Sequence, residues 1–193
     1  DVTIIGPFCV ENLYSTGCSL GDGLTSWDFA NSIVDIPCFG FLPWYHDYRD
    51  MVYEVERGHT YVLTVTAGSE NTYFDVWIDF NDDFVFSNAD ELILNDGLCA
   101  TANAPYTFNI TIPVDAPGGT HVIRYRTNYF LPVTDPCATY DFGNATDFMV
   151  SIPPWISIEP SAGILNAGES MNVFVFFNSA GLDYGVYNAD ILF

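Results

Sequence analysis

The stretch Asp75–Glu91 reads DVWIDFNDDFVFSNADE, and the prediction of the fold starts from it. From Phe74 onward, apolar side chains occupy every second position, and the residues between them are mostly acidic. A period of two is typical of a β-strand that turns one face toward a core. The predicted core face carries Phe74, Val76, Ile78 and Phe80, and the opposite face carries Asp75, Trp77 and Asp79.

The second half of the stretch is an acidic loop. Oxygen-bearing side chains stand at every second position after the strand, and Glu91 follows further on. Short side chains at this spacing can converge on one hard divalent cation, and a longer carboxylate can close the site from behind. We therefore expect a structural Ca²⁺, with Asp82 and Asp90 as substitute ligands. The expected ligands are the side chains of Asp79, Asn81, Asp83 and Glu91 and the carbonyl of Val85.

Strand patterns recur along the chain and predict an all-β fold, an antiparallel β-sandwich. The segments are rich in β-branched and aromatic residues and are separated by turns that contain Gly or Pro. Within residues 107–112 the alternation places Phe108, Ile110 and Ile112 inward. The predicted strands are Tyr61–Thr66, Thr107–Ile112, His121–Thr127, Thr146–Ile152 and Val173–Phe177.

The composition excludes several classes of function. The 193 residues are 49% hydrophobic, which is enough for a large core, and carry a formal net charge of -21. Only four residues are basic, all of them arginine, so the chain cannot form the positive patch that nucleic acids or anionic membrane surfaces require. No apolar run is long enough to insert into a bilayer. The first residues do not have the pattern of a signal peptide, and we expect Asp1 to be a mature or trimmed terminus.

The five cysteines show no CxxC or His–Cys zinc spacing, and we expect disulfides in an oxidising, extracellular compartment. The expected pairs are Cys99 with Cys137 and two of Cys9, Cys18 and Cys38 with each other, Cys9 and Cys18 being our choice. One thiol is then left free or forms an intermolecular bond.

Two arginines share one face of the predicted strand His121–Thr127. Arg124 and Arg126 carry half of the positive charge of the chain. Because a partly buried arginine needs a carboxylate, we expect one of them to form an ion pair with Asp147.

Three aromatic residues stand close together in the segment WYHDYRD, residues 44–50. Trp44, Tyr45 and Tyr48 could form a stacking surface for a sugar or another partner. The competing interpretation is that they lie half-buried across a strand.

The chain lacks the sequence motifs of common enzymes. HExxH, GxSxG, phosphate-binding glycine loops and the dinucleotide fingerprint are all missing, and no serine or cysteine motif accompanies the three histidines. We therefore expect no catalysis, although paired carboxylates of the kind that hydrolyse glycosides are common in so acidic a chain.

Residues 8–152 resemble the GEVED domain of secreted bacterial proteins. The stretch after Val76 is the most specific part of the resemblance. The landmarks are Phe8-Cys9, Cys18, Tyr45-His46-Asp47-Tyr48, Gly58, Tyr61–Val65, Val76–Asn81 with Asp83, Phe86 and Glu91, the Arg124 and Arg126 strand, and Cys137. The chain departs from the family at two places. It has Gly143-Asn144-Ala145-Thr146-Asp147-Phe148 where the family has Gly-Glu-Val-Glu-Asp-Tyr, and Phe84 replaces the usual loop glycine.

Residues 153–193 are similar to the later half of a bacterial Ig-like repeat of the BACON or ASPM-like kind. The landmarks are Trp155, Pro160, Gly163, Ala167-Gly168, Val173–Phe177 and Gly185-Val186-Tyr187. The domains expected from the two resemblances are thus a jelly-roll or Ig-like sandwich at 1–152 and a partial Ig-like β domain at 153–193.

The resemblance implies a non-catalytic, calcium-stabilised module of a larger extracellular or cell-surface protein, which serves in adhesion, ligand display or spacing. Its partners would be the other domains of that protein, identical subunits or glycans. One alternative is a filament subunit, in which the N-terminal DVTIIG strand completes the C-terminal sandwich of a neighbour. A second alternative is a carbohydrate-binding module built on Trp44, Tyr45 and Tyr48.

Overall fold

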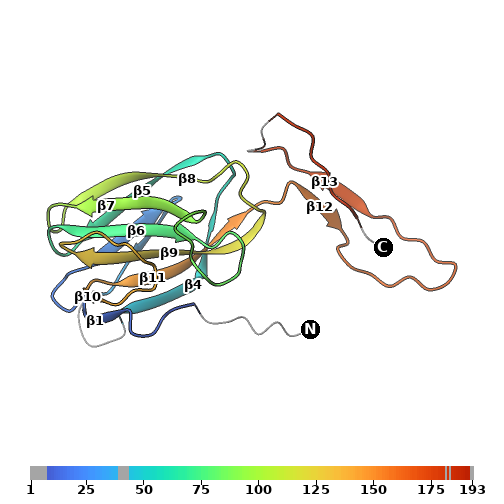
Figure 1. Ribbon diagram of the computed structural model, residues 1–193. Helices are drawn as coiled ribbons and strands as arrows, with labels where there is room; N and C mark the ends of the chain where they lie inside the picture. Colours follow the sequence, from blue (N-terminus) through green and yellow to red (C-terminus); the bar gives the residue numbers. More distant parts are fainter. Residues whose placement is uncertain (1–7, 39–43, 181, 183, 192–193) are drawn as a thin grey trace.

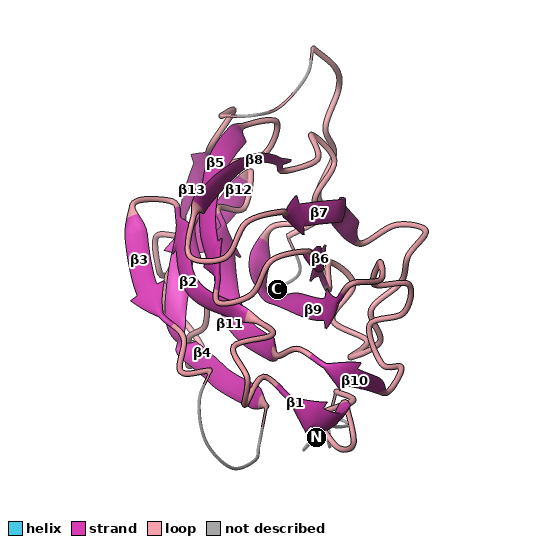
Figure 2. Cartoon of the chain, turned by 90° about the vertical axis from the view of Figure 1, so that its left-hand side faces the viewer, coloured by secondary structure: helices cyan, strands magenta, loops and turns pink. Residues whose placement is uncertain are grey.

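The computed structural model describes residues 8–38, 44–180, 182 and 184–191. This part of the chain contains strands, turns and loops and no helix (Figure 2), so it holds no helix that could cross a membrane. The strands are β1 (Tyr14–Gly17), β2 (Leu24–Phe29), β3 (Ser32–Asp35), β4 (Tyr45–Glu54), β5 (Thr60–Ala67), β6 (Thr72–Ile78), β7 (Leu92–Cys99), β8 (Pro105–Thr111), β9 (Gly119–Tyr129), β10 (Tyr140–Phe142), β11 (Ala145–Ile152), β12 (Ile156–Glu159) and β13 (Phe174–Phe177).

Two sheets pack face to face and form a β-sandwich, as the strand patterns predicted (Figure 1). The larger sheet has the order β4-β11-β9-β6-β7, and the smaller one has the order β3-β2-β5-β8. Their pairing is antiparallel except between β4 and β11, which run parallel. Short strands β1 and β10 form a separate parallel pair beside the larger sheet.

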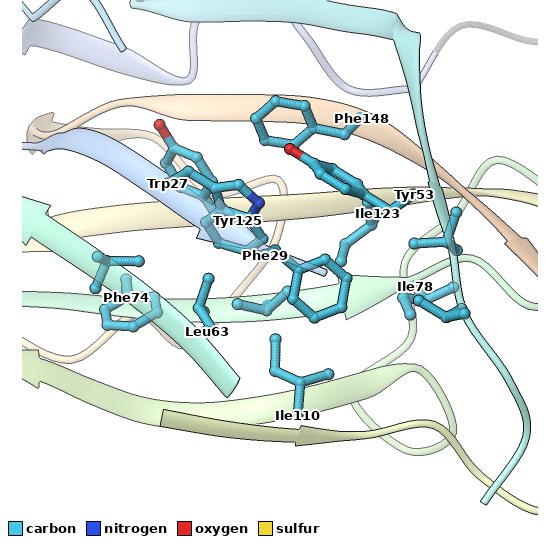
Figure 3. Packing of buried hydrophobic residues seen from close by; sticks show 14 of the residues in the cluster. Trp27, Phe29, Tyr53, Leu63, Phe74, Ile78, Ile110, Ile123, Tyr125 and Phe148 are labelled. Atoms are coloured by element: carbon cyan, nitrogen blue, oxygen red, sulfur yellow. The ribbon is translucent and has the colours of Figure 1, made fainter. Parts of the chain in front are cut away.

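Aromatic side chains from both sheets fill the core. Trp27 on β2 stacks on Tyr125 of β9 and on Phe148 of β11, with ring centroids 5.3 and 5.7 Å apart (Figure 3). All three residues are fully buried. Stacked pairs of this kind add about 0.5–1.5 kcal/mol each to the free energy gained by burying the rings.

The outer face of the larger sheet is covered as well. Phe74, Val76, Ile78 and Phe80 face the main core as predicted. Trp77, on the opposite face of β6, is also buried, because it packs with Phe8, Phe86, Val122 and Val133 in a second cluster. The loops that supply Phe8, Phe86 and Val133 therefore form a third layer over β6 and β9.

An irregularity separates two regular halves of the edge strand β4. Asp47 pairs with Asp147, and Val52 pairs with Met149. Between these two pairs, β11 has a single residue, Phe148, whereas β4 has the four residues 48–51. Such a bulge bends the strand locally and ends regular pairing there.

The C-terminal part forms a small sheet of its own, in which β12 pairs with β13 (Figure 1). The four residues of β13 are all exposed, from 38% at Val175 to 73% at Phe177. The predicted strand is confirmed, but its apolar side chains remain largely exposed within the described part of the chain, and the Phe177 ring lies 6.4 Å from that of Trp155. The segment DVTIIG lies outside the described residues.

The disulfides agree with the expected pairs in part: two of Cys9, Cys18 and Cys38 do pair, but they are Cys18 and Cys38, and Cys137 takes another partner than Cys99. Cys9 bonds to Cys137 and Cys18 bonds to Cys38, with Cα atoms 5.6 and 5.2 Å apart. Cys99 is a free, buried thiol. The predicted Cys99–Cys137 bond was wrong because Cys99, at the end of β7, points into the core, whereas Cys137 lies in a loop of the covering layer. Two disulfides are compatible with an oxidising, extracellular location.

Candidate functional site

The acidic loop joins β6 to β7, and its two ends are held together. The Ile78 amide donates to the Glu91 carbonyl at 2.9 Å, which extends the ladder between the strands. The Asp79 amide donates to the Val122 carbonyl on β9 at 3.0 Å. These bonds fix the backbone of the first and last acidic residues of the loop next to the sheet.

The carboxylates of Asp79 and Glu91 are both buried where the two ends of the loop meet, which we call the neck of the loop. Their exposed fractions are 1% and 2%. One oxygen of each accepts a backbone hydrogen bond, Asp79 Oδ2 from Phe84 N at 3.0 Å and Glu91 Oε2 from Ser87 N at 2.8 Å. The other oxygens, Asp79 Oδ1 and Glu91 Oε1, are buried and have no hydrogen-bond partner among the described residues. A buried carboxylate oxygen without a partner is costly unless a cation or a proton compensates for its charge.

The negative charges of these carboxylates raise one another's pKa. Burial raises the pKa of Asp79, and the charges of Asp82 and Asp83 raise it further. Burial also raises the pKa of Glu91, with added contributions from the charges of Asp79 and Asp83. Three carboxylates, those of Asp79, Asp83 and Glu91, therefore repel one another here, and a divalent cation between them would remove that repulsion.

The remaining expected ligands lie on the exposed side of the loop. Asp83 accepts hydrogen bonds from Asn81 Nδ2 at 3.1 Å and from Val85 N at 2.8 Å. No group of three or more His, Cys, Asp or Glu side chains in the described part of the chain is arranged to hold a metal ion. The expected set includes an Asn side chain and a backbone carbonyl, so carboxylates alone would not complete it.

Two contacts that sequence patterns did not predict anchor the loop to its surroundings. His121 lies on β9 with Nδ1 3.1 Å from Asp82 Oδ1 and Nε2 3.2 Å from the Pro117 carbonyl. Trp77 Nε1 donates to Asn88 Oδ1 at 2.9 Å. Nothing in the sequence pairs residues so far apart along the chain, because only the sheet brings them together.

Arg124 is the arginine that pairs with Asp147, as expected for one of the two. Its Nε and Nη2 donate to the two oxygens of Asp147 at 2.6 and 2.8 Å, and both residues are fully buried. Its guanidinium also lies over the Phe86 ring, 4.7 Å from the centroid. The ion pair therefore lies between the larger sheet and the covering layer and contacts the layer through Phe86.

Among the described residues, Arg126 pairs with no carboxylate and is held by neutral oxygens instead. It donates to the carbonyls of Leu13, Pro136 and Ala138 and, at 3.3 Å, to the Tyr14 hydroxyl. These acceptors lie in the segments that carry Cys9 and Cys137. Arg126 therefore ties both ends of that disulfide region to β9.

The structure brings together only two of the three residues of the expected aromatic platform: Trp44 and Tyr45 line one cavity of about 350 Å³, and Tyr48 lines another. Trp44 is 8% exposed and packs against the Cys18–Cys38 cluster. The Tyr45 hydroxyl donates to Asp147 at 2.7 Å, and burial, followed by the Asp147 charge, raises the pKa of Tyr45. Tyr48 turns to the other side of β4 and packs on Phe148. The three rings therefore do not form one common face, because Tyr48 points to the opposite side of β4 from Tyr45.

Part of this chain matches a model of a known protein family. Residues 73–151 match the GEVED domain. The match begins in β6, includes the whole acidic loop and ends in β11. A search of curated proteins finds no match. The resemblance of the last forty residues to an Ig-like repeat stays a prediction.

Within the GEVED segment, the departure from the family motif at Asn144 has a structural role. Asn144 is fully buried, and its side chain accepts from Leu24 N at 3.0 Å and donates to Leu24 O at 2.8 Å. The amide therefore binds the backbone of β2 as a neighbouring strand would, and it joins the two sheets. A glutamate could accept there but not donate at neutral pH.

Proposed function

We propose that this protein is a non-catalytic, extracellular β-sandwich module whose acidic loop is stapled by a structural Ca²⁺, and that it serves in adhesion, ligand display or spacing within a larger protein. The two buried, unpartnered oxygens of Asp79 and Glu91 are the observation that carries the staple. The match to the GEVED domain and the two disulfides support the extracellular setting.

The chemistry of the loop fits calcium better than other common ions. The expected ligands are all oxygens, which hard cations prefer, and the loop offers neither thiolate nor imidazole for zinc. Several ligands come from a loop of irregular backbone, which suits the adaptable geometry of Ca²⁺ more than the strict octahedron of Mg²⁺. The ion would supply positive charge and would hold the loop against β9.

Thermal unfolding tests the staple. The melting temperature should rise by several degrees in millimolar Ca²⁺ relative to excess chelator, because only the folded state presents the site. Glu91→Gln should lose this shift, since a neutral amide removes one of the two buried charges. Asp115→Asn is the matched control, because Asp115 is exposed and lies outside the loop.

A wild-type melting temperature that is the same in Ca²⁺ and in chelator would refute the proposed structural Ca²⁺. An equal shift with Mg²⁺ would show that divalent cations act as general counterions for a chain of net charge -21 and do not bind specifically in the loop.

The exposed strand β13 favours a second candidate function, that of a self-assembling filament subunit. Four consecutive apolar residues, Phe174–Phe177, are exposed on a sheet of only two strands. A two-stranded sheet is marginal alone and gains stability from a third strand. A strand donated by a neighbouring subunit, with DVTIIG as the candidate, would cover it.

Electron microscopy of the purified chain tests this candidate. Uniform fibres that disappear when residues 1–6 are deleted would support strand donation. A monodisperse monomer at high concentration, established by light scattering, would rule it out.

A further inference from the structure

A groove of about 780 Å³ lies on the outer face of the larger sheet, where the covering layer ends. Val122 of β9 and Met149 of β11 contribute to its lining, Phe84 of the acidic loop borders it, and so does the bulged part of β4, residues 47–50. The groove therefore lies between the two most irregular segments of this face, the loop and the bulge. Bulges often occur next to functional sites.

The polar edge of the groove is formed by Asp47 and Arg49, which are bonded to each other and are called the Asp47–Arg49 fork below. Arg49 donates to both oxygens of Asp47, from Nε at 2.8 Å and from Nη2 at 2.6 Å, and its amide donates to Oδ1 at 3.2 Å. This bonding lowers the pKa of Asp47, so the pair stays charged. Both side chains remain about half exposed, at 43% and 46%. The guanidinium keeps further N–H donors and the carboxylate further lone pairs for a ligand.

The opposite wall is a phenylalanine held in an unfavourable backbone conformation. Phe84 has φ of 67°, in the left-handed region that glycine adopts readily and bulky residues rarely do. Its ring contacts Phe8 edge to face, at 5.2 Å, and borders the groove on its exposed side. A strained residue beside a groove is an indication of function.

The lining selects the chemical class of ligand. Anions are repelled, because the chain has a net charge of -21 and Asp50 lies at the groove. A regular peptide strand is disfavoured by the bulge, which interrupts the edge of β4. A neutral sugar ring fits, since it has one apolar face for Val122, Met149 and Phe84 and a rim of hydroxyls that both donate and accept.

We propose that this groove binds a neutral saccharide, which the Asp47–Arg49 fork holds by its hydroxyls and the Phe84 ring covers from the side. The site shares Tyr48 with the expected platform of Trp44, Tyr45 and Tyr48, whereas Trp44 and Tyr45 line a different cavity. Phe84 N also donates to Asp79 Oδ2, so the position of the Phe84 wall depends on the acidic loop. Loading of the loop with Ca²⁺ therefore strengthens saccharide binding; this coupling rests on the proposed calcium staple.

The test uses the whole chain on an array of neutral, sialylated and sulfated oligosaccharides, followed by titration calorimetry with the neutral glycan that gives the strongest signal. Arg49→Gln removes the charged donors and should weaken binding by about tenfold or more. Phe84→Gly removes the wall and should weaken binding similarly, while it relieves the backbone strain and keeps the amide that Asp79 accepts.

A matched control exists for the glycine substitution. Phe130 is also a phenylalanine with positive φ, 68°, and it is 64% exposed. It follows the far end of β9, eight residues after Val122, which is about 26 Å along a strand. Phe130→Gly relieves the same kind of strain and should leave saccharide binding unchanged.

The possible results separate the two proposals. Binding that falls in Arg49→Gln and Phe84→Gly but not in Phe130→Gly supports the groove. No neutral glycan bound, only anionic glycans bound, or binding indifferent to both groove variants overturns it. A calcium-dependent melting temperature without glycan binding leaves the staple standing and removes the groove. Glycan binding that is unchanged by chelator keeps the groove and removes its coupling to the loop.

Discussion

Asp79 and Glu91, twelve positions apart in the sequence, raise each other's cost of carrying charge at the neck of one loop, and each buries a carboxylate oxygen that accepts no hydrogen bond from the described residues. The fold imposes this relationship, because the β6–β7 ladder closes directly behind both residues through the bond from Ile78 N to Glu91 O. The negative charges are costly without a cation and favourable with one, so the loop should respond strongly to substitutions that change its charge.

Asp79→Asn should have opposite effects in chelator and in calcium. In chelator the variant should melt at a higher temperature than the wild type, because a neutral amide removes a buried charge and its oxygen can still accept from Phe84 N. In saturating Ca²⁺ the order should reverse, because the variant has lost a ligand charge. Calorimetric melting of both proteins in both buffers measures this crossing. A variant less stable than the wild type in chelator would contradict it.

Asp75 should make the protein less stable as the pH rises from 4 to 6. Its carboxyl is 2% exposed, and burial raises its pKa to about 6, although the Asp96 amide donates to it at 2.7 Å. In this window the folded state keeps a proton that the unfolded state has lost, so folding is favoured at the acid end and weakened by up to about 1 kcal/mol per pH unit toward pH 6.

The variant Asp75→Asn isolates this contribution. Relative to the wild type, it should gain stability steadily from pH 4 to pH 6 and keep a constant advantage above that range. Urea unfolding in chelator at several pH values measures the difference. Asp115→Asn should show no such trend, and a flat difference for Asp75→Asn would refute the assignment.

Breaking the Arg124–Asp147 pair from one side should cost about 3–5 kcal/mol, because a fully buried charge is left alone. Arg124→Met and Asp147→Leu should each show this loss in denaturant unfolding, and the double variant should lose less than the sum. The exposed Arg49–Asp47 pair is the internal comparison, since Arg49→Gln should cost about 1 kcal/mol or less. Equal losses at the buried and exposed pairs would be inconsistent with this account.

The two disulfides should contribute unequally to stability. The Cys9–Cys137 bond spans 128 positions, whereas Cys18–Cys38 spans 20. Because the longer loop loses more entropy in the unfolded state, replacing the first pair by serine should cost about 1.6 kcal/mol more than replacing the second. Unfolding of the two double-serine variants in urea compares them, and the reverse order would show that native contacts dominate instead.

The remaining thiol should be inert until the protein unfolds. Burial raises the pKa of Cys99 to about 12, and its side chain packs in the main core. Alkylation of the native, unreduced protein at pH 8 should give no label, and alkylation in denaturant should give one, at Cys99. Mass spectrometry of digested protein locates it; a label on Cys137 or Cys9 would contradict the observed pairing.

Local pattern was enough to predict several of the strands, namely β5, β6, β8, β9, β11 and β13. Phe74 to Phe80 alternate with a period of two, and β6 turns those residues into the core, because the pleat fixes the direction of each side chain wherever a strand forms. The same periodicity could not show that Trp77, on the other face, is equally buried. Its cover comes from Phe8 and Val133, which lie in distant parts of the chain.

The sequence by itself determined the all-β class, the position of the acidic loop and the need of one buried arginine for Asp147, since each follows from residue type and near-neighbour spacing. Only the tertiary structure decided which arginine pairs with Asp147, that Cys9 rather than Cys99 meets Cys137, and that Tyr45 and Tyr48 face apart. The order in which strands lie in the two sheets sets these contacts, and that order is fixed by how distant segments pack together.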